Sequence, residues 1–236
     1  MILSSLAVMQ PYLFPNLSYY KLMACVEQVV FYDDVQFIKG GWINRNQVLH
    51  QQTAKPFRLS LVDASSNKRI NEVLLFRKEY EVASLQKTLY HTYAKAPYYA
   101  PVSALIHDVL NYPSQYIAEI AEQSIRQVFQ YLQWPLQACR SSELNVNRTA
   151  SDKTDRLIAL IKHFGKVNYV NAIGGKELYH KDYFQTQGIQ LHFISPTTHV
   201  YNQFKAPFVP GLSMIDVLMF NDIPTIHRFL QDIELE

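Results

Sequence analysis

The sequence predicts an α/β protein with a core of parallel strands built on βαβ units and a mainly helical insertion in mid-chain. Three observations predict this class. Short, fully apolar runs are typical of strands buried on both faces. Helical periodicity dominates the middle of the 236-residue chain, and strand and helix signals alternate again after it. We expect one α/β domain over residues 1–236, with the helical insertion at approximately 79–134.

The N-terminal segment predicts a βαβ unit. Residues 6–9 form a short apolar run, and two prolines make Gln10–Pro15 a loop. Asn16 or Ser18 can cap the following helix. Residues 29–32 form a second apolar run, so two buried strands are joined by a helix, which implies parallel pairing and a right-handed crossover.

The remaining elements follow from periodicity and from capping residues. Strands are predicted at 57–61 and 70–75, before the helical insertion. In the last third, strands are predicted at 168–171 and 189–194, a helix capped by Ser151 ends near Gly165, and a second helix covers Glu177–Gln187.

Composition narrows the functional classes. Hydrophobic residues make up 48% of the chain and charged residues 18%, which excludes a disordered protein. The net charge of +2 without a basic stripe argues against a nucleic-acid partner. The chain has no signal-like leader and no apolar run of the ~20 residues that a membrane span needs, so we expect a cytoplasmic protein. The two cysteines and eight histidines show no metal-ligand spacing, and the sequence identifies no cofactor.

Polar residues follow the ends of the first two predicted strands, where open α/β sheets bind ligands. Gln10 and Tyr12 lie in the first loop, where Tyr12 and Phe14 can stack on a flat ligand or fill the core. Asp33 and Asp34 follow the second strand and are candidates for the general base. Because neighbours in an extended chain point to opposite faces, we expect one carboxylate to face the site and the other to cap a turn. Ordinary turn chemistry is the alternative.

The segment that follows has the composition of a binding loop. Gln36 precedes it, and Gly40–Asn46 then offers a large aromatic ring, two amides and a guanidinium in Trp42, Asn44, Arg45 and Asn46. A guanidinium forks well onto carboxylate or phosphate. We expect Tyr12, an aspartate of the 33–34 pair, Asn44 and Arg45 to line one cleft; the alternative is a solvated turn.

A third candidate lies between a predicted strand and helix. Gly174 and Gly175 let the backbone approach a ligand, and Lys176 adds a charge at a helix start, where anions bind. A tight structural turn is equally consistent. Two other polar segments are given structural roles: Ser213 caps a helix with Asp216 at its third position, and Lys153–Arg156 is a solvated first turn.

In their order along the chain these segments resemble the WbqC-like family of bacterial proteins. The resemblance spans nearly the whole chain, and it is most specific in its first three segments. The matching segments are Met9–Tyr12 with Phe14–Pro15, Tyr32–Phe37, Gly41–Asn46, Tyr93 with Ala96–Tyr98, Ser141–Glu143, Gly174–Tyr179, Tyr201 with Gln203, and Leu212–Asp216.

The resemblance implies a role in making bacterial surface polysaccharide, such as the O-antigen of lipopolysaccharide. It supplies no catalytic residues, so the residue roles above are inferences from chemistry. The leading hypothesis is a transferase that modifies a nucleotide-linked or lipid-linked sugar, for example by acyl or aminoacyl transfer to an amino sugar. The alternative is a non-catalytic binding or accessory protein of the same pathway, which would form a homo-oligomer or bind a pathway enzyme.

Overall fold

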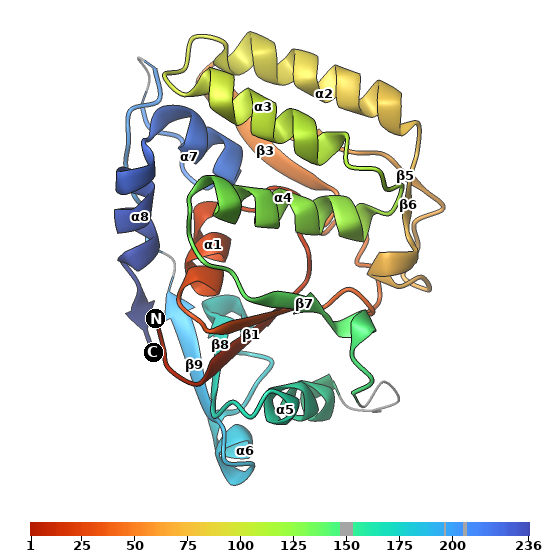
Figure 1. The fold of residues 1–236 in the computed structure, drawn as a ribbon, viewed down its shortest axis with the longest axis vertical. Coiled ribbons are helices and arrows are strands. Elements are labelled where there is room, and N and C mark those ends of the chain that lie inside the picture. The colour runs from red at the N-terminus through yellow and green to blue at the C-terminus, as the bar shows by residue number, and fades with distance from the viewer. Residues whose placement is uncertain (147–152, 196, 205–206) are drawn as a thin grey trace.

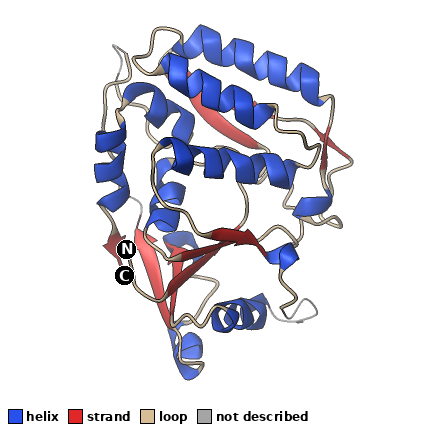
Figure 2. Cartoon of the chain, viewed as in Figure 1, coloured by secondary structure: helices blue, strands red, loops and turns tan. Residues whose placement is uncertain are grey.

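The computed structural model describes residues 1–146, 153–195, 197–204 and 207–236. It confirms the α/β class: a six-stranded sheet in the order β10-β9-β8-β1-β2-β7 lies at its centre (Figures 1 and 2). All neighbouring strands are parallel except the edge strand β10, which is antiparallel to β9. The strands are β1 Ser5–Met9, β2 Gln28–Phe31, β7 Ala138–Arg140, β8 Asn168–Ala172, β9 Gln190–Ser195 and β10 Glu234–Leu235.

The predicted βαβ unit is confirmed as β1, α1 (Leu17–Ala24) and β2. Asn16 is the N-cap of α1, and its side-chain oxygen accepts a hydrogen bond from the amide of Tyr19 at 3.3 Å. Along β1, Ala7 and Met9 pack into one apolar cluster, whereas Leu6 and Val8 pack into another on the opposite face. This alternation buries both faces of the sheet, as an uninterrupted apolar strand requires.

Helices cover both faces of the sheet unequally. The helical insertion is confirmed as α2 Lys78–Tyr93, α3 Tyr99–Leu110 and α4 Ile117–Tyr131, which stack on the side of the sheet that carries α1 (Figure 1). Helices α7 Met214–Phe220 and α8 Ile223–Gln231 also belong to this larger layer. Helices α5 Lys153–His163 and α6 Lys181–Thr186 lie on the other side.

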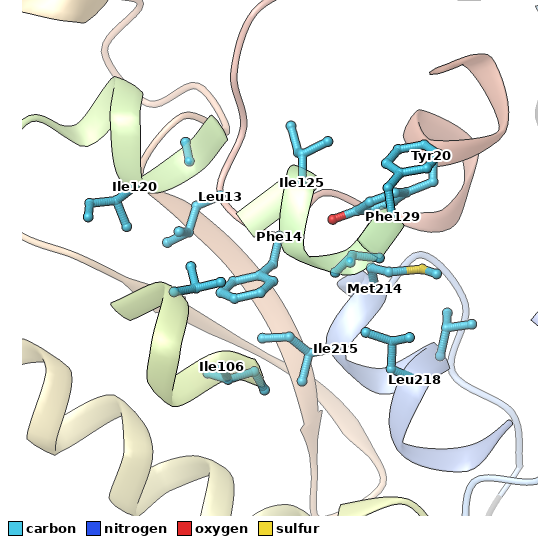
Figure 3. Close-up of a cluster of buried hydrophobic side chains, with 14 of the residues drawn as sticks. Leu13, Phe14, Tyr20, Ile106, Ile120, Ile125, Phe129, Met214, Ile215 and Leu218 are labelled. Atoms are coloured by element: carbon cyan, nitrogen blue, oxygen red, sulfur yellow. The ribbon is translucent and has the colours of Figure 1, made fainter. Parts of the chain in front are cut away.

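The N-terminal loop enters the larger helical layer. Leu13 and Phe14 point into the apolar cluster formed with α4 and α7, which includes Ile120 and Ile215 (Figure 3). Phe14 is fully buried, so it fills the core and does not offer its ring to a ligand. Its backbone has a φ of +42°, and its amide donates a hydrogen bond to Ser124 Oγ at 2.8 Å.

Between the βαβ unit and the insertion the structure departs from the expected strands. A hairpin of β3 Arg45–His50 and β4 Thr53–Arg58 precedes a short pair of β5 Leu61–Val62 and β6 Leu74–Leu75. The strand expected at 57–61 is therefore split: β4 ends at Arg58, the Leu59 amide still bonds to the Asn44 carbonyl at 2.8 Å beyond it, and Leu61 starts β5. The strand expected at 70–75 begins as the 3-10 helix η1 (Ile70–Glu72), where the Ile70 amide bonds to the Val35 carbonyl at 2.9 Å.

The predicted strands of the last third are confirmed as β8 and β9, but the helix expected at 177–187 is shorter. A 3-10 turn, η3 (Ile173–Gly175), follows β8, and α6 begins only at Lys181. The Tyr179 ring packs edge-on against Phe184 and Tyr169, and this packing holds 176–180 in a turn. The expected cap Ser151 lies outside the described residues. Within the described ranges, no helix combines the length and apolarity needed to cross a membrane.

Candidate functional site

The carboxyl edge of the sheet contains a topological switch point between β1 and β8. The chain leaves β1 through α1, which packs on one face, and leaves β8 through α6, which packs on the other. Such opposed crossovers open a crevice at the carboxyl ends of the two strands. The segments that follow the strands at this edge are residues 10–15, 32–34, 141–143 and 173–176.

Asp33 is a buried carboxylate whose donors among the described residues are all uncharged; its residue exposure is 2%. Its Oδ1 accepts hydrogen bonds from the Ser142 amide at 2.9 Å and from Ser141 Oγ at 3.1 Å. Its Oδ2 accepts from Ser142 Oγ at 2.5 Å and, at the limit of hydrogen-bond distance, from Asn71 Nδ2 at 3.5 Å. Donors from η1 and from the 3-10 helix η2 (Ser141–Glu143) therefore meet at the end of β2.

Asp34 is also buried but has a cationic partner. Its Oδ2 pairs with Nη2 of Arg156, on α5, at 2.5 Å. The Arg156 guanidinium also lies 5.0 Å from the centre of the Tyr32 ring, a cation–π distance. Burial raises the pKa of Tyr32, so this phenol stays protonated.

The expectation that Arg156 belongs to a solvated first turn is wrong. Arg156 is buried because the first turn of α5 faces the end of β2, with Leu157 and Leu160 packed beneath it. Its Nε is buried and has no hydrogen-bond acceptor among the described residues. A buried donor without an acceptor costs about 1–3 kcal/mol.

The two carboxylates converge; the expectation that they face opposite ways is also wrong. Ser141 Oγ lies within hydrogen-bond distance of Oδ1 of both Asp33 and Asp34. The strand ends at Phe31, and the chain bends there, so the alternation of an extended chain no longer applies. The single proton of Ser141 can serve only one carboxylate at a time, which couples the two acids.

The loop at 10–15 is held in place by the segment that follows Trp42. Asn46 is buried, and its Nδ2 donates to the carbonyls of Leu13 at 3.2 Å and Phe14 at 2.7 Å. The Leu13 amide donates to the Ile43 carbonyl at 3.1 Å. Asn46 is thus placed to shape the loop, and its amide group is engaged within the protein.

The two other predicted residues of this loop lie at its surface side. Tyr12 is half-buried and stacks on Tyr19 with ring centres 5.0 Å apart. Its hydroxyl lies 3.4 Å from the side-chain oxygen of Gln10, and the Tyr19 hydroxyl donates to the Gln10 carbonyl. Burial raises the pKa of Tyr12.

Arg45 folds back onto its own turn. Its Nε donates to the Gly41 carbonyl at 2.9 Å, its Nη2 donates to the Gly40 carbonyl, and its guanidinium lies 5.3 Å from the Trp42 ring centre. Asn44 donates to the Leu59 carbonyl at 2.7 Å. No hydrogen bond or ion pair in the described part of the chain joins Arg45 to the aspartates.

Gln36 and the glycine–lysine segment lie at the periphery. Gln36 is exposed and forms an isolated bridge with Arg69. Lys176 was expected at a helix start, but it follows η3, five residues before the start of α6, and pairs with Glu236 at 2.6 Å on the surface. A Cβ at Gly175 would meet the Asn171 side chain at 2.5 Å, whereas Gly174 faces open space. The geometry therefore gives Gly175 a packing role.

The match to known sequences decides the family. The model of the WbqC-like protein family covers residues 10–228.

This chain belongs to the WbqC-like protein family.

It is similar to the uncharacterized protein Rv1507c of Mycobacterium tuberculosis, with 22% identity over 222 residues, 93% of this chain and 94% of that protein. No solved structure matches the chain. The family match covers both aspartates and their partners Asn71, Ser141, Ser142 and Arg156.

Among the residues that contact the two aspartates of this WbqC-like chain, Ser141 and Ser142 belong to a segment that carries the family resemblance. That resemblance was the one feature of the sequence that pointed to them. No feature pointed to Asn71 or Arg156. Within the described ranges, no three His, Cys, Asp or Glu side chains gather as they would around a metal ion.

A further buried acid lies among the helices, away from Asp33 and Asp34. Asp216 is fully buried and accepts hydrogen bonds from the hydroxyls of Tyr93 and Tyr201, each at 2.7 Å, and from Gln203 Nε2 at 2.6 Å. Burial raises the pKa of Asp216, although the three hydrogen bonds act in the opposite direction. The expected cap is confirmed, since Ser213 Oγ accepts from the Ile215 amide at 3.2 Å, but the Asp216 carboxylate faces the tyrosines.

Proposed function

We propose that this WbqC-like protein is a transferase that moves a group such as an acyl or aminoacyl group onto a sugar intermediate of bacterial surface-polysaccharide synthesis. The family resemblance supplies the pathway. One observation supports catalysis: two buried carboxylates share a hydroxyl at the carboxyl end of β2, next to the switch point of the sheet.

The proposal assigns the base role to Asp33. Asp34 is paired with a guanidinium, so its Oδ2 is already engaged within the protein and is not free to bond a substrate group. Within the described ranges Asp33 receives uncharged donors only, and its contact to Asn71 is long, so a sugar hydroxyl or amine can replace that contact. Asp34 then acts as a positioning residue that orients Asp33 through Ser141.

Arg156 supports an anionic substrate group. Its Nε–H lacks an acceptor in the described residues, and a phosphate of a nucleotide-linked or lipid-linked sugar would provide one after a small side-chain movement. In this proposal Gln10, Tyr12 and Gly174 flank the substrate across the switch point. Gln36, Trp42, Asn44, Arg45, Asn46, Gly175 and Lys176 contribute by shaping the neighbouring loops.

Incubation of the protein with UDP- and dTDP-linked amino sugars and acyl or aminoacyl donors, read out by mass spectrometry, tests the proposal. We expect a sugar product of increased mass, formed about 10²–10⁴ times more slowly by Asp33→Asn. Asp222→Asn is the matched control, because asparagine caps α8 as well as the exposed aspartate does. A product whose rate is unchanged in Asp33→Asn contradicts the assigned base.

A specific observation favours the accessory role as the second candidate. Phe76 and Tyr80, near the start of α2, are 45% and 71% exposed, and Leu74 and Tyr116, which form a bridge, are 37% and 45% exposed. Exposed apolar groups of this kind mark protein contacts. Binding of a sugar nucleotide without turnover, together with a stable complex or dimer that Tyr80→Ser and Phe76→Ser disrupt, would support this role.

A further inference from the structure

A cavity of about 500 Å³ lies away from the acidic pair, between the β3–β4 turn, the C-terminal end of α2 and the segment around Gln203. Helix α2 lies at the top of Figure 1, on the side of the molecule farthest from the sheet. The cavity volume falls in the range of small-molecule sites, about 300–1,000 Å³. Nothing in the proposed transfer reaction uses this cavity.

The side chains at the cavity indicate an uncharged ligand. Gln51 and Gln52 carry both a donor and an acceptor, and His50 and His91 offer imidazoles in place of fixed charges. Phe204 adds an aromatic ring whose exposed fraction is 46%. Among the described residues that line the cavity there is no lysine, arginine or carboxylate, so it is poorly suited to phosphate.

Three residues around the cavity adopt left-handed backbone conformations that are unfavourable for their type. The values of φ are +46° at Gln51, +64° at Gln52 and +53° at Phe204. A two-residue hairpin turn with two positive φ angles favours Asn-Gly, which adopts them with little strain. Strained non-glycine residues gather at functional sites, where the side chain provides what glycine cannot.

The floor of the cavity is rigid. Gln203 accepts a hydrogen bond from the Val209 amide at 2.7 Å and donates to buried Asp216 at 2.6 Å. The amide of Leu49, another wall residue, donates to the hydroxyl of Tyr93 at 2.9 Å, and Tyr93 donates to the same aspartate. A floor held in this way is preorganised, which reduces the ordering cost of binding.

We propose that this cavity binds the base of a nucleoside. Glutamine pairs its amide with the adjacent donor and acceptor on the edge of a base, and Phe204 offers a face on which the base can stack. The exposed aromatic face of Phe204 favours a flat ring that can stack, in preference to a polyhydroxylated sugar ring, which needs a hydrogen-bond partner for each of its hydroxyls. The proposal is independent of the transferase proposal, because the two sites share no residue.

The test uses the full chain and five nucleosides: uridine, thymidine, cytidine, adenosine and guanosine. Binding is measured by saturation-transfer NMR and calorimetry, with ribose and N-acetylglucosamine as sugar probes. We expect at least one nucleoside to bind through its base protons and neither sugar to bind. Absence of binding by all five nucleosides at millimolar concentration overturns the proposal, and so does binding of either sugar at the cavity.

Two sets of variants locate the ligand. The double variant Gln51→Asn/Gln52→Gly relieves the turn, so its urea midpoint should rise while nucleoside affinity falls about tenfold or more, the loss expected for two hydrogen bonds. Thr92→Phe fills the cavity and should abolish binding, whereas Thr88→Phe, one turn earlier on α2 and outside the cavity, should not. Affinity that is unchanged in the double variant and in Thr92→Phe places the ligand elsewhere and overturns the proposal.

Discussion

Two of the buried acidic networks of this protein, those of Asp34 and Asp216, stabilise their carboxylates by different means. Asp34, at the edge of the sheet, is compensated by the full charge of Arg156. Asp216, among the helices, is surrounded by the dipoles of Tyr93, Tyr201 and Gln203, and no cation pairs with it in the part of the chain that the structure describes. Burial raises the pKa of Asp216 despite these hydrogen bonds. Uncharged donors therefore fill the hydrogen-bonding positions of this buried carboxylate without fully offsetting the free-energy cost of its lost hydration.

Removal of the cation should have the largest effect on stability. Arg156→Met leaves Asp34 buried without a counter-charge, and breaking a buried pair in this way costs about 3–5 kcal/mol. Urea unfolding measures the loss. The double variant Arg156→Met/Asp34→Asn should recover part of it, because no unpaired charge remains; a double variant no more stable than the single one would show that charge compensation is not the main role of Arg156.

Removal of one dipole at Asp216 should have a smaller effect. Tyr201→Phe deletes one hydrogen bond to a charged group, worth about 1.5–3 kcal/mol at neutral pH. Tyr131→Phe, at a half-buried tyrosine outside this network, is the control. Equal urea midpoints for wild type and Tyr201→Phe would remove Tyr201 from the set of groups that stabilise the carboxylate.

The pH dependence separates the two networks further. Because the folded-state pKa of Asp216 is raised, its favourable contribution is fully present below the unfolded pKa, near 3.8, and is lost as pH rises through the folded pKa. Asp216→Asn cannot ionise, so relative to wild type its free energy of unfolding should improve as pH rises from about 4 toward neutrality. A difference between the two proteins that is constant with pH would contradict the raised pKa.

Arg45 has the opposite charge to Asp216 and is likewise held by uncharged groups. Its guanidinium contacts the carbonyls of Gly40 and Gly41 and the face of the Trp42 ring. Arg45→Lys keeps the charge and loses the planar fork, so we expect a loss of about 0.5–1.5 kcal/mol, the value of one ordinary hydrogen bond. Arg58→Lys, across the hairpin from it, is the control. If Arg45→Lys lowers ligand affinity but not stability, the guanidinium leaves its turn to contact substrate.

The exposed pair Lys176–Glu236 should have the smallest effect. Both side chains are about half exposed, so water screens their attraction. Lys176→Ala should leave the urea midpoint unchanged within error. A measurable loss of stability that salt does not reduce would show that the Lys176 side chain stabilises the fold by packing and not by its exposed ion pair.

The sequence predicted the parts of the fold that local pattern determines. The apolar runs of β1, β2, β8 and β9 and the helical periodicity of α2 to α4 are each encoded by neighbouring residues, and all were confirmed. The edge strand β7 was not predicted, because only its pairing with β2 identifies it. The expected helix at 177–187 is shorter because ring packing of Tyr179 outweighs helical propensity.

The sequence predicted where Asp33 and Asp34 lie, at the end of the second strand, but not most of the side chains that contact them. Polar residues at a strand end are informative in this fold class, which is why these two were singled out. Arg156 lies more than a hundred residues from them in the chain, and nothing in a local pattern distinguishes its buried guanidinium from a solvated one. The Asn46 amide was expected to face a ligand, whereas it holds the loop carbonyls of Leu13 and Phe14, a tertiary contact that sequence does not reveal.

The hydrogen bonds that fix the Phe14 backbone have a consequence for the order of folding. Its amide bonds to Ser124, 110 positions away, and its carbonyl accepts from Ser213, 199 positions away. Contacts so distant in sequence carry a large loop-closure cost and form late. During synthesis the loop of Gln10 and Tyr12 can therefore take its final shape only after Ser213 has been made, so this segment becomes ordered long after its own synthesis.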